Sequence, residues 1–295
     1  MLQTRLISSM PTLSQSMLIF PLVILSFFLS PCASRPAPSR TEQTNSSEKA
    51  NLTITYMGNE GVLISSGDKQ VLIDALHREY KPDYAFPPPE LLKSLETAQA
   101  PYNDVDLVLV SHVHLDHFHP ASVGLHLLNN PKAVLVSSQQ VVDAVAKASG
   151  NFKEIAQRVQ RATPEWKNSL TFNEGGIKLK VLGLRHSSER FIGIQNLGHL
   201  IEINGVKLLH VGDADGKAEN FSSFHLDQEG IDIAFIPFWY LLTDSGRALV
   251  RDHIKPKQII AVHIPPADAP GFTAEFKQRF PDVITLTQIL ESKRF

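Results

Sequence analysis

The sequence predicts an α/β domain of mixed β-sheets covered by helices, which begins near residue 51. Two patterns predict this class: short β-rich runs follow one another as hairpins at the start of the region, and later strands alternate with helical periodicity. The composition agrees, since 43% hydrophobic and 20% charged residues in a chain of 295 can build a large core. A formal net charge of -2, with lysine and arginine spread along the chain, argues against a nucleic-acid partner.

The first 34 residues differ from the rest and predict a cleaved secretory signal peptide. The apolar run 17–30 contains Pro21 and is shorter than the roughly 20 residues that a membrane-spanning helix needs. The single cysteine, Cys32, ends the sequence LSPC, which partly resembles a bacterial lipobox, so a lipoprotein signal stays open as the alternative. Residues 35–50 are rich in Pro, Ser and Thr and predict a flexible linker. We therefore expect an exported protein, periplasmic or secreted, with lipid anchoring or peripheral membrane association as further options.

The elements of the domain at 51–295 can be assigned in order. Three strands, at 51–57, 61–66 and 70–76, are separated by short Gly-containing turns and predict an antiparallel meander. Seven later strands are expected at 105–111, 132–138, 177–184, 198–203, 206–213, 231–238 and 257–264. Helical patterns lie near 120–129, 139–149, 151–161, 216–226, 245–254 and 273–280.

The proline-rich stretch 77–103 interrupts this pattern. It has little strand periodicity, and its aromatic residues include Tyr80, Tyr84 and Phe86. One interpretation is a flap that covers a site and sets specificity; the other is a surface connection whose aromatic residues pack on the core.

A cluster of polar side chains, SHVHLDHFHP at 111–120, directly follows an apolar run that reads as a buried strand. In extended backbone, alternate side chains share a face about 6.6 Å apart, so His112 and His114 can converge on one ion. Asp116 continues this spacing, and a turn there would let Asp116 and His117 serve a second ion. Chance rarely produces this order of ligand-type residues, so we interpret the loop as metal-binding.

Three further candidates, His186, Asp213 and His263, each stand at the end of another predicted strand. Taken alone, each has an ordinary explanation, such as a turn aspartate in GDADG or a histidine before two prolines. Their recurrence at strand ends favours a dinuclear metal site.

The order H-x-H-x-D-H, His, Asp, His resembles the five metal-binding motifs of the metallo-β-lactamase superfamily, over residues from Ile54 to His263. The resemblance implies an αββα sandwich, in which two mixed β-sheets are flanked by helices and the metals lie at one edge of the sheets. It also implies the ligands: His112, His114 and His186 for the first ion, Asp116, His117 and His263 for the second, and Asp213 bridging both.

Differences within the superfamily narrow the implied activity. Asp213 stands where β-lactamases with a cysteine ligand have that cysteine, which argues against antibiotic hydrolysis. The opening at 54–76, together with 111–120, is more similar to the branch that contains ascorbate-phosphate lactonases and the N-acyl phosphatidylethanolamine phospholipase D type. This similarity implies hydrolysis of a phosphodiester, lactone or carboxyl ester in a small-molecule or lipid-like substrate.

The implied mechanism uses two divalent metal ions, zinc first and manganese or iron as alternatives, that hold a hydroxide at neutral pH. Asp116 would orient the hydroxide and later protonate the leaving group. The rival from another class is a non-catalytic metal-binding sensor or partner-binding module that retains the site.

The sequence contains further candidate site residues that are not predicted metal ligands. Trp239 and Tyr240 follow a strand that should end near the metals, and we expect them to contact substrate, with core packing as the alternative. His119 is either a hydrogen-bond partner of a ligand or a helix-entry residue before Pro120. Arg190 and Gln195 either reach a substrate or belong to a solvated hairpin tip.

Overall fold

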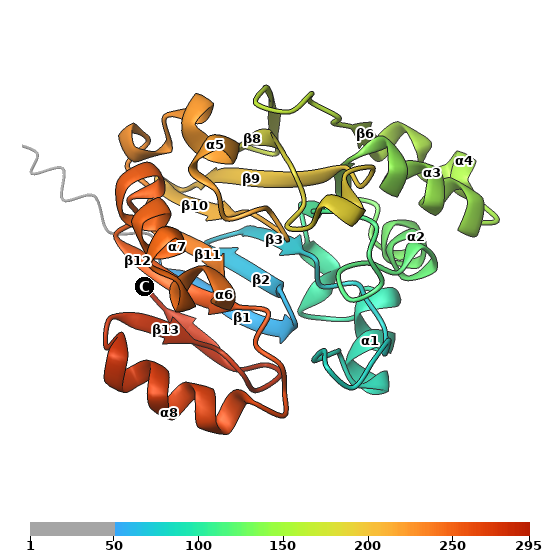
Figure 1. The fold of residues 1–295 in the computed structure, drawn as a ribbon. Coiled ribbons are helices and arrows are strands. Elements are labelled where there is room, and N and C mark those ends of the chain that lie inside the picture. Colours follow the sequence, from blue (N-terminus) through green and yellow to red (C-terminus); the bar gives the residue numbers. More distant parts are fainter. Residues whose placement is uncertain (1–50) are drawn as a thin grey trace, which may run out of the picture. The chain divides into compact units, whose positions relative to one another are not determined.

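The structure is a computed structural model and describes residues 51–295. The predicted signal peptide (1–34) and linker (35–50) lie outside the described residues. Figure 1 shows the described part of the chain as two β-sheets with helices on their outer sides. None of the helices described in residues 51–295 is long and apolar enough to cross a membrane.

The first sheet has the strand order β14-β1-β2-β3-β4-β5-β6. Its strands β1, β2 and β3 form the antiparallel meander that the sequence predicts, and β3 to β6 continue it as parallel strands. The bounds are β1 Leu52–Gly58, β2 Gly61–Ser66, β3 Lys69–Ile73, β4 Leu107–Val110, β5 Val134–Ser137, β6 Val159–Arg161 and β14 Ser292–Arg294. The last strand pairs with β1, so the C-terminal end of the chain returns to the first sheet.

The second sheet has the order β13-β12-β11-β10-β9-β8-β7. Here β7 to β10 are antiparallel, and β10 to β13 are parallel. The bounds are β7 Ser169–Glu174, β8 Ile177–Leu184, β9 Asn196–Ile203, β10 Val206–His210, β11 Ile233–Pro237, β12 Gln258–Val262 and β13 Val283–Thr285.

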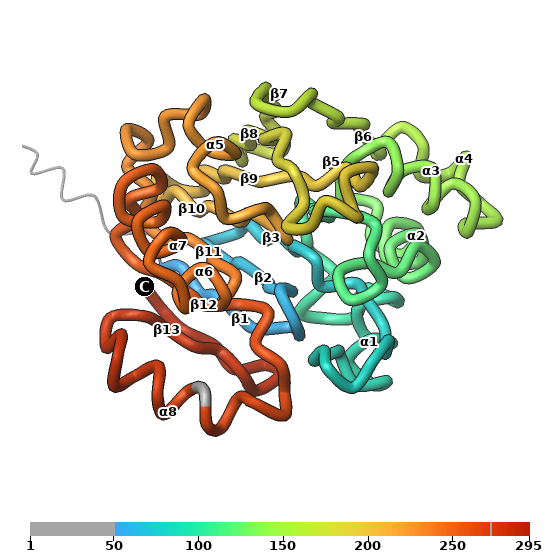
Figure 2. The backbone as a smooth tube through the Cα atoms, in the orientation of Figure 1, coloured from blue at the N-terminus to red at the C-terminus, as the bar shows by residue number. Residues whose placement is uncertain are grey.

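The helices form the two outer layers. The α-helices are α1 Pro89–Glu96, α2 Pro120–Asn129, α3 Gln139–Ala148, α4 Phe152–Ile155, α5 Ala218–Phe221, α6 Phe238–Leu242, α7 Asp244–Leu249 and α8 Ala269–Arg279. Short helical turns are η1 Tyr102–Asp104, η2 Ala156–Arg158, η3 Glu189–Phe191, η4 Ser222–Phe224 and η5 Leu226–Gln228, and a π-helix, η6 Val250–Ile254, extends α7. Figure 2 follows the chain from the blue and green first sheet, with α1 to α4, into the yellow and red second sheet, with α5 to α8.

Three apolar clusters hold these layers together. Inward-facing residues of both sheets, such as Ile54, Leu109 and Phe235, pack between the sheets. Leu95 of α1 and Val123 of α2 pack on the outer face of the first sheet. Apolar residues from the second half of the chain cover the outer face of the second sheet. Burying each large apolar side chain contributes about 1.5–3 kcal/mol. The predicted αββα sandwich is confirmed.

All ten predicted strands are found, and the clearest errors concern short elements. The helical pattern at 151–161 ends in a strand, β6, because its last three residues join the edge of the first sheet. The strands β7, β13 and β14 and the helices α1 and α6 were not predicted. Each has 8 residues or fewer and lies at a sheet edge or in a connection. Segments this short contain too few residues for a helical or strand periodicity to be detected.

Candidate metal centre

The topology brings several strand ends to one edge of the sandwich. Strands β1, β3 and β4 run in one direction, and so do β8, β10 and β12 in the second sheet, because each intervening antiparallel pair reverses the chain twice. Residues that follow these strands therefore meet. The seven predicted ligands are such residues: His112, His114, Asp116 and His117 after β4, His186 after β8, Asp213 after β10 and His263 after β12.

The seven side chains lie in two sets. In the first, Nδ1 of His114 lies 2.9 Å from Nε2 of His112 and 3.2 Å from Nε2 of His186, and Oδ2 of Asp213 lies 3.4 Å from the His186 nitrogen. The potential ligand atoms of this set all lie within 4.8 Å of one another. Ligands at about 2.0–2.1 Å from a tetrahedral ion are about 3.3 Å apart, so these spacings suit one metal ion.

The second set has similar spacings. Nε2 of His117 and Nε2 of His263 each lie 3.4 Å from Oδ2 of Asp116. The other carboxylate oxygen of Asp213, Oδ1, lies 3.5 Å from the His117 nitrogen and 3.4 Å from that of His263. Asp213 thus directs Oδ2 to one set and Oδ1 to the other.

The chemistry of these donors fits a pair of cations. Oδ1 of Asp213 is buried and accepts no hydrogen bond from the described residues, which is costly for an ionised oxygen unless a cation faces it. Burial alone would raise the pKa of Asp213 and Asp116, but nearby His117 and His263 lower both below the usual range for aspartate. The two carboxylates are therefore ionised and can act as ligands.

Hydrogen bonds behind the ligands fix which ring nitrogen faces the centre. Asp74, at the end of β3, accepts a hydrogen bond from Nδ1 of His117 at 2.9 Å and others from the amide and hydroxyl of Ser111 at 2.7 and 2.5 Å. The Ser111 hydroxyl in turn lies 2.9 Å from Nδ1 of His112. A proton on each of these Nδ1 atoms leaves the opposite Nε2 free to bind metal.

Two residues at the tip between β1 and β2 complete the surroundings. Asn59 donates from Nδ2 to Oδ2 of Asp116 at 3.1 Å and to its carbonyl oxygen at 3.2 Å. Glu60 is buried, and neither of its carboxylate oxygens has a hydrogen-bond partner among the described residues. Burial and the charge of Asp213 raise the pKa of Glu60 well above its usual value.

The backbone around the ligands is also constrained. Asp74 and His263 adopt positive φ angles of 46° and 64°, a left-handed conformation that costs about 1–3 kcal/mol for such residues. Gly212, just before Asp213, has φ of 55°, and a Cβ there would lie 2.7 Å from the Cβ of Ser111. Only glycine allows the loop that carries Asp213 to approach the loop after β4 this closely.

A pocket of about 430 Å³ opens over the two sets, and Asp116, Asp213, His114, His186 and His263 lie in its wall. Val113, Leu115 and several aromatic side chains form its apolar lining. Phe191 packs edge-on against His114 and His186, with ring centroids 4.6 and 4.8 Å apart. Trp239 and Tyr84 pack in the same way against His263, at 5.0 and 5.4 Å.

The predicted flap divides into two parts. Tyr80 and Tyr84 lie in the pocket wall, as the flap hypothesis expects, and Phe86 lines a neighbouring hollow. The backbone at Ala85 and Phe86 runs against Gly58, where a Cβ would lie 3.0–3.1 Å from it. The remainder, including α1, packs on the first sheet through Leu91 and Leu95. The loop at 80–84 thus belongs to the pocket, and the rest belongs to the core.

The two predicted substrate contacts, Trp239 and Tyr240, have different positions. Trp239 lines the pocket. Tyr240 does not: it is 1% exposed, and its hydroxyl donates to the carbonyl oxygen of Ala214 at 2.5 Å. The expectation for Tyr240 is wrong, because successive residues of the helix α6 point about 100° apart and only one of the two can face the pocket. Tyr240 instead supports the loop that carries Asp213.

Replacing this hydroxyl should affect stability more than catalysis. Tyr240→Phe leaves the Ala214 carbonyl without its donor, so we expect the free energy of unfolding to fall by about 1–2 kcal/mol. Because the ring still fills its site against Gly216, metal content should stay unchanged. Thermal unfolding and elemental analysis of the variant test both statements; loss of metal without loss of stability would contradict them.

The remaining candidates have structural positions. His119 caps the helix α2 by accepting from the amide of Ser122, so it is the helix-entry residue of the two alternatives. Gln195 exchanges hydrogen bonds with Gln140 of α3, which holds its loop in place. Arg190 lines the pocket. Sequence reasoning missed Asp74, Asn59 and Glu60; an aspartate directly after the apolar strand at 69–73 was the available signal for the first.

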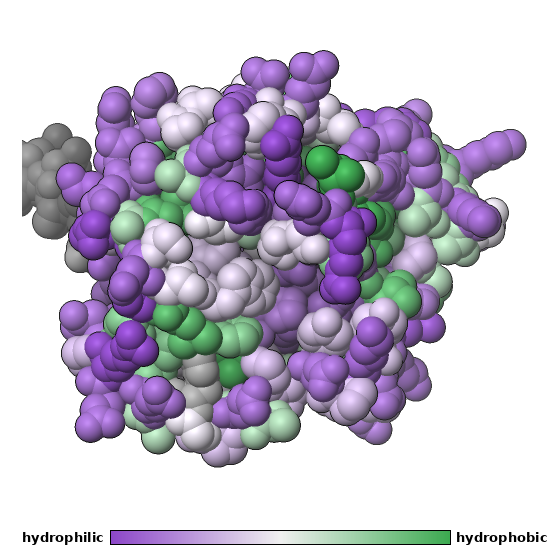
Figure 3. All heavy atoms as spheres, viewed as in Figure 1, coloured by the Kyte–Doolittle hydropathy of each residue, from purple (hydrophilic) through white to green (hydrophobic). Residues whose placement is uncertain are grey.

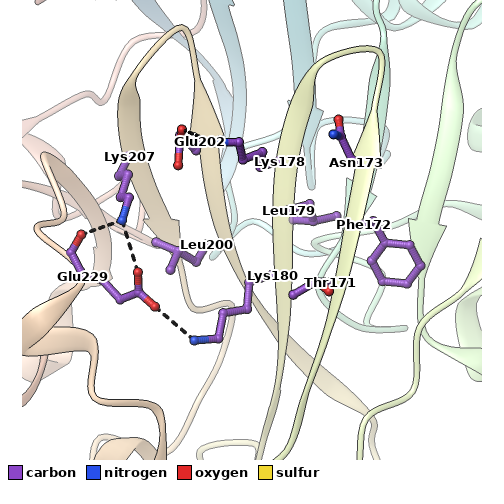
Figure 4. A pocket seen from close by; sticks show the side chains of 10 residues that line it. All are labelled: Thr171, Phe172, Asn173, Lys178, Leu179, Lys180, Leu200, Glu202, Lys207 and Glu229. Atoms are coloured by element: carbon purple, nitrogen blue, oxygen red, sulfur yellow. Dashed lines mark hydrogen bonds and ion pairs between the residues drawn. The ribbon is translucent and has the colours of Figure 1, made fainter. Parts of the chain in front are cut away.

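A second hollow, of similar volume, lies over β7 to β10 (Figure 4). Its lysines are paired with its own glutamates: Lys178 with Glu202, and both Lys180 and Lys207 with Glu229. Apolar side chains also show at the lower left of Figure 3. A small hollow is lined by Leu242 at the end of α6, by Phe276 of α8 and by Phe280 just after α8. Neither place contains a predicted ligand, so the ligand-lined pocket is the candidate site.

Comparisons with known proteins agree with this fold. A UPF0173 metal-dependent hydrolase of Thermus thermophilus is 25% identical over 218 residues, which cover 71% of this chain and 82% of that protein. Igni18, a metallo hydrolase from Ignicoccus hospitalis, has a similar fold, with a TM-score of 0.55, 17% identity, and coverage of 83% of this chain and 98% of that one. CmlA, a diiron β-hydroxylase from Streptomyces venezuelae, also shares the fold, with a TM-score of 0.51, 13% identity, and coverage of 83% and 54%.

Residues 69–265, which contain all seven predicted ligands, match the family described as the beta-lactamase superfamily domain. The match covers more than half of the chain, and it agrees with the two-sheet sandwich and with the ligands at one edge of the sheets. The chain therefore belongs to the metallo-β-lactamase superfamily.

Proposed function

We propose that the protein is a metal-dependent hydrolase that holds two divalent metal ions and cleaves an ester-type bond, such as a phosphodiester, lactone or carboxyl ester. The observation that carries the proposal is the division of Asp213 between two sets of ligands, because one carboxylate with an oxygen for each set is suited to bridge two ions. The names of the related proteins support metal-dependent hydrolysis. Nitrogen and carboxylate ligands favour zinc, with manganese or iron as alternatives.

When bound, two such ions would activate a water molecule and polarise the scissile bond. The protein's own part is to fix the reacting groups. Asn59 holds the Asp116 carboxylate through Oδ2, which leaves Oδ1 to take a proton from the attacking water and return it to the leaving group. His117 and His263 lower the pKa of Asp116, so its carboxylate is ionised. Trp239 and Tyr84 would exclude water and pack against the substrate.

An open pocket beside the ligands favours catalysis over the non-catalytic alternative, since a sensor site needs no space for a substrate next to its metals. For the cellular context we propose export to the periplasm or the outside of the cell, with lipid anchoring or membrane association as options, as the N-terminal sequence predicts.

A panel of p-nitrophenyl phosphodiesters, carboxyl esters and lactones tests the proposal, with the protein loaded with zinc, manganese or iron in turn. We expect turnover of at least one class that a chelator abolishes and the metal restores. An Asp213→Ala protein purified in parallel controls for contaminating hydrolases. Equal activity of the variant and the wild type, or no turnover by any metal-loaded form, would contradict the proposal.

A further inference from the structure

Two cationic side chains at the pocket mouth have no anionic partner in the described structure. Lys81 and Arg190 both line the pocket, and neither forms an ion pair with any carboxylate within residues 51–295. The only acidic residues in the pocket wall are Asp116 and Asp213, which lie among the predicted metal ligands. The positive charge at the mouth is therefore available to a ligand.

The two cations belong to different loops of the pocket wall. The guanidinium of Arg190 lies 4.4 Å from the ring centre of Phe191, which packs against His114 and His186 of the first set. Lys81 lies 4.8 Å from the ring centre of its neighbour Tyr80. Tyr80 stacks at 6.0 Å on Tyr84, which packs against His263 of the second set. Each set of ligands is thus contacted by an aromatic side chain that is linked to one of the cations.

Both loops are held in place by the protein itself. Gln140 of α3 donates to the carbonyl oxygen of Gly193 at 2.7 Å and exchanges two further hydrogen bonds with Gln195, which fixes the loop of Arg190. The loop of Lys81 turns through a hydrogen bond from the amide of Tyr84 to the Lys81 carbonyl at 3.1 Å, just before its contact with Gly58. The loops that carry the two cations are therefore held in position even when no ligand is bound.

We infer that the substrate carries an anionic group, either a carboxylate or a phosphate, which Lys81 and Arg190 bind at the pocket mouth. This group is remote from the bond that is cleaved. The substrate also has a flat apolar body, which lies between Phe191 and the wall formed by Tyr84 and Trp239. The inference specifies the class of substrate that the proposed hydrolase would cleave. The statement that a bond is cleaved rests on the proposed function. A cation that stacks on an aromatic face keeps its N–H donors free for an anion, and such charged hydrogen bonds are stronger than neutral ones.

The test measures binding, so it does not depend on turnover. Isothermal titration of metal-loaded protein compares 4-phenylbutyrate with the uncharged 4-phenylbutanamide, which has the same body. We expect the wild type to prefer the carboxylate. Lys81→Ala and Arg190→Ala should each weaken its binding by about 5- to 10-fold and leave amide binding unchanged. The surface substitutions Lys147→Ala and Arg161→Ala serve as matched controls.

The outcomes separate this inference from the proposed reaction. If both variants keep the wild-type preference, the carboxylate is held by the metal ions alone and the inference is wrong. If neither compound binds the wild type, the pocket does not accept this class and the inference is also wrong. A preference that the two variants lose would support the inference even if the ester panel showed no hydrolysis, in which case only the proposed reaction would fall.

Discussion

Asp213→Ala is expected to lose at least one of the two metal ions and nearly all activity. The substitution removes Oδ2 from the first set and Oδ1 from the second, so neither set keeps its full number of ligands. It should therefore reduce activity by more than the roughly 10- to 100-fold that follows loss of an outer hydrogen-bond partner of a ligand. Elemental analysis and assays on the best substrate of the panel measure both effects.

Two controls accompany this variant. Asp215→Ala removes a neighbouring carboxylate that pairs with Lys217 near the surface, and it should keep both metal content and activity. His119→Ala removes a helix cap, which costs about 1 kcal/mol of stability and should leave most of the activity. If Asp213→Ala behaved like His119→Ala, the assignment of Asp213 as the bridging ligand would be wrong.

Asp74→Asn is expected to have the second largest effect, although Asp74 is not one of the seven ligands. Its carboxylate orients His117 directly and His112 through Ser111, so it supports one ligand in each set. An amide in its place would turn an NH₂ group toward one of these donors. We expect the affinity for both ions to fall by about 10- to 100-fold and the free energy of unfolding to fall by about 1–3 kcal/mol.

The matched control is Asp106, which lies at the other end of the strand pair β3 and β4. Asp106 is also buried, precedes β4, and accepts a hydrogen bond from the amide of Gln70 at 2.8 Å. Asp106→Asn should lower stability by a comparable amount but leave metal affinity unchanged. Metal titrations that gave the same loss of affinity for both variants would mean that Asp74 acts only through general stability.

The sequence was most informative where chemistry and periodicity coincide. Four ligands in one short loop and three more at strand ends could be identified, because ligand-type residues directly after apolar runs are recognisable without a structure. The positions of Asn59 and Glu60 could not be predicted. The predicted meander implies that the tip between β1 and β2 lies at the same end of the first sheet as the ligands, but not that these two side chains turn toward them.

The direction of side chains in short elements could not be predicted from the sequence either. Trp239 and Tyr240 follow a predicted strand, and the sequence alone did not show that they belong to the short helix α6. Trp239 and Tyr240 consequently have different environments, one in the pocket wall and one beneath the loop of Asp213. Of the two unpaired cations at the pocket mouth, the sequence indicated Arg190 as one of two alternatives and did not indicate Lys81, because pairing depends on which loops meet in space.

The central claim is that seven side chains hold two metal ions, and the amount of metal bound per chain tests it most directly. Protein purified under metal-replete conditions and freed of loosely bound ions by gel filtration should contain two transition-metal ions per chain by elemental analysis, and the same measurement identifies the metal. A reproducible value of two would agree with the division of Asp213 between two sets. A reproducible value of one or zero would contradict it.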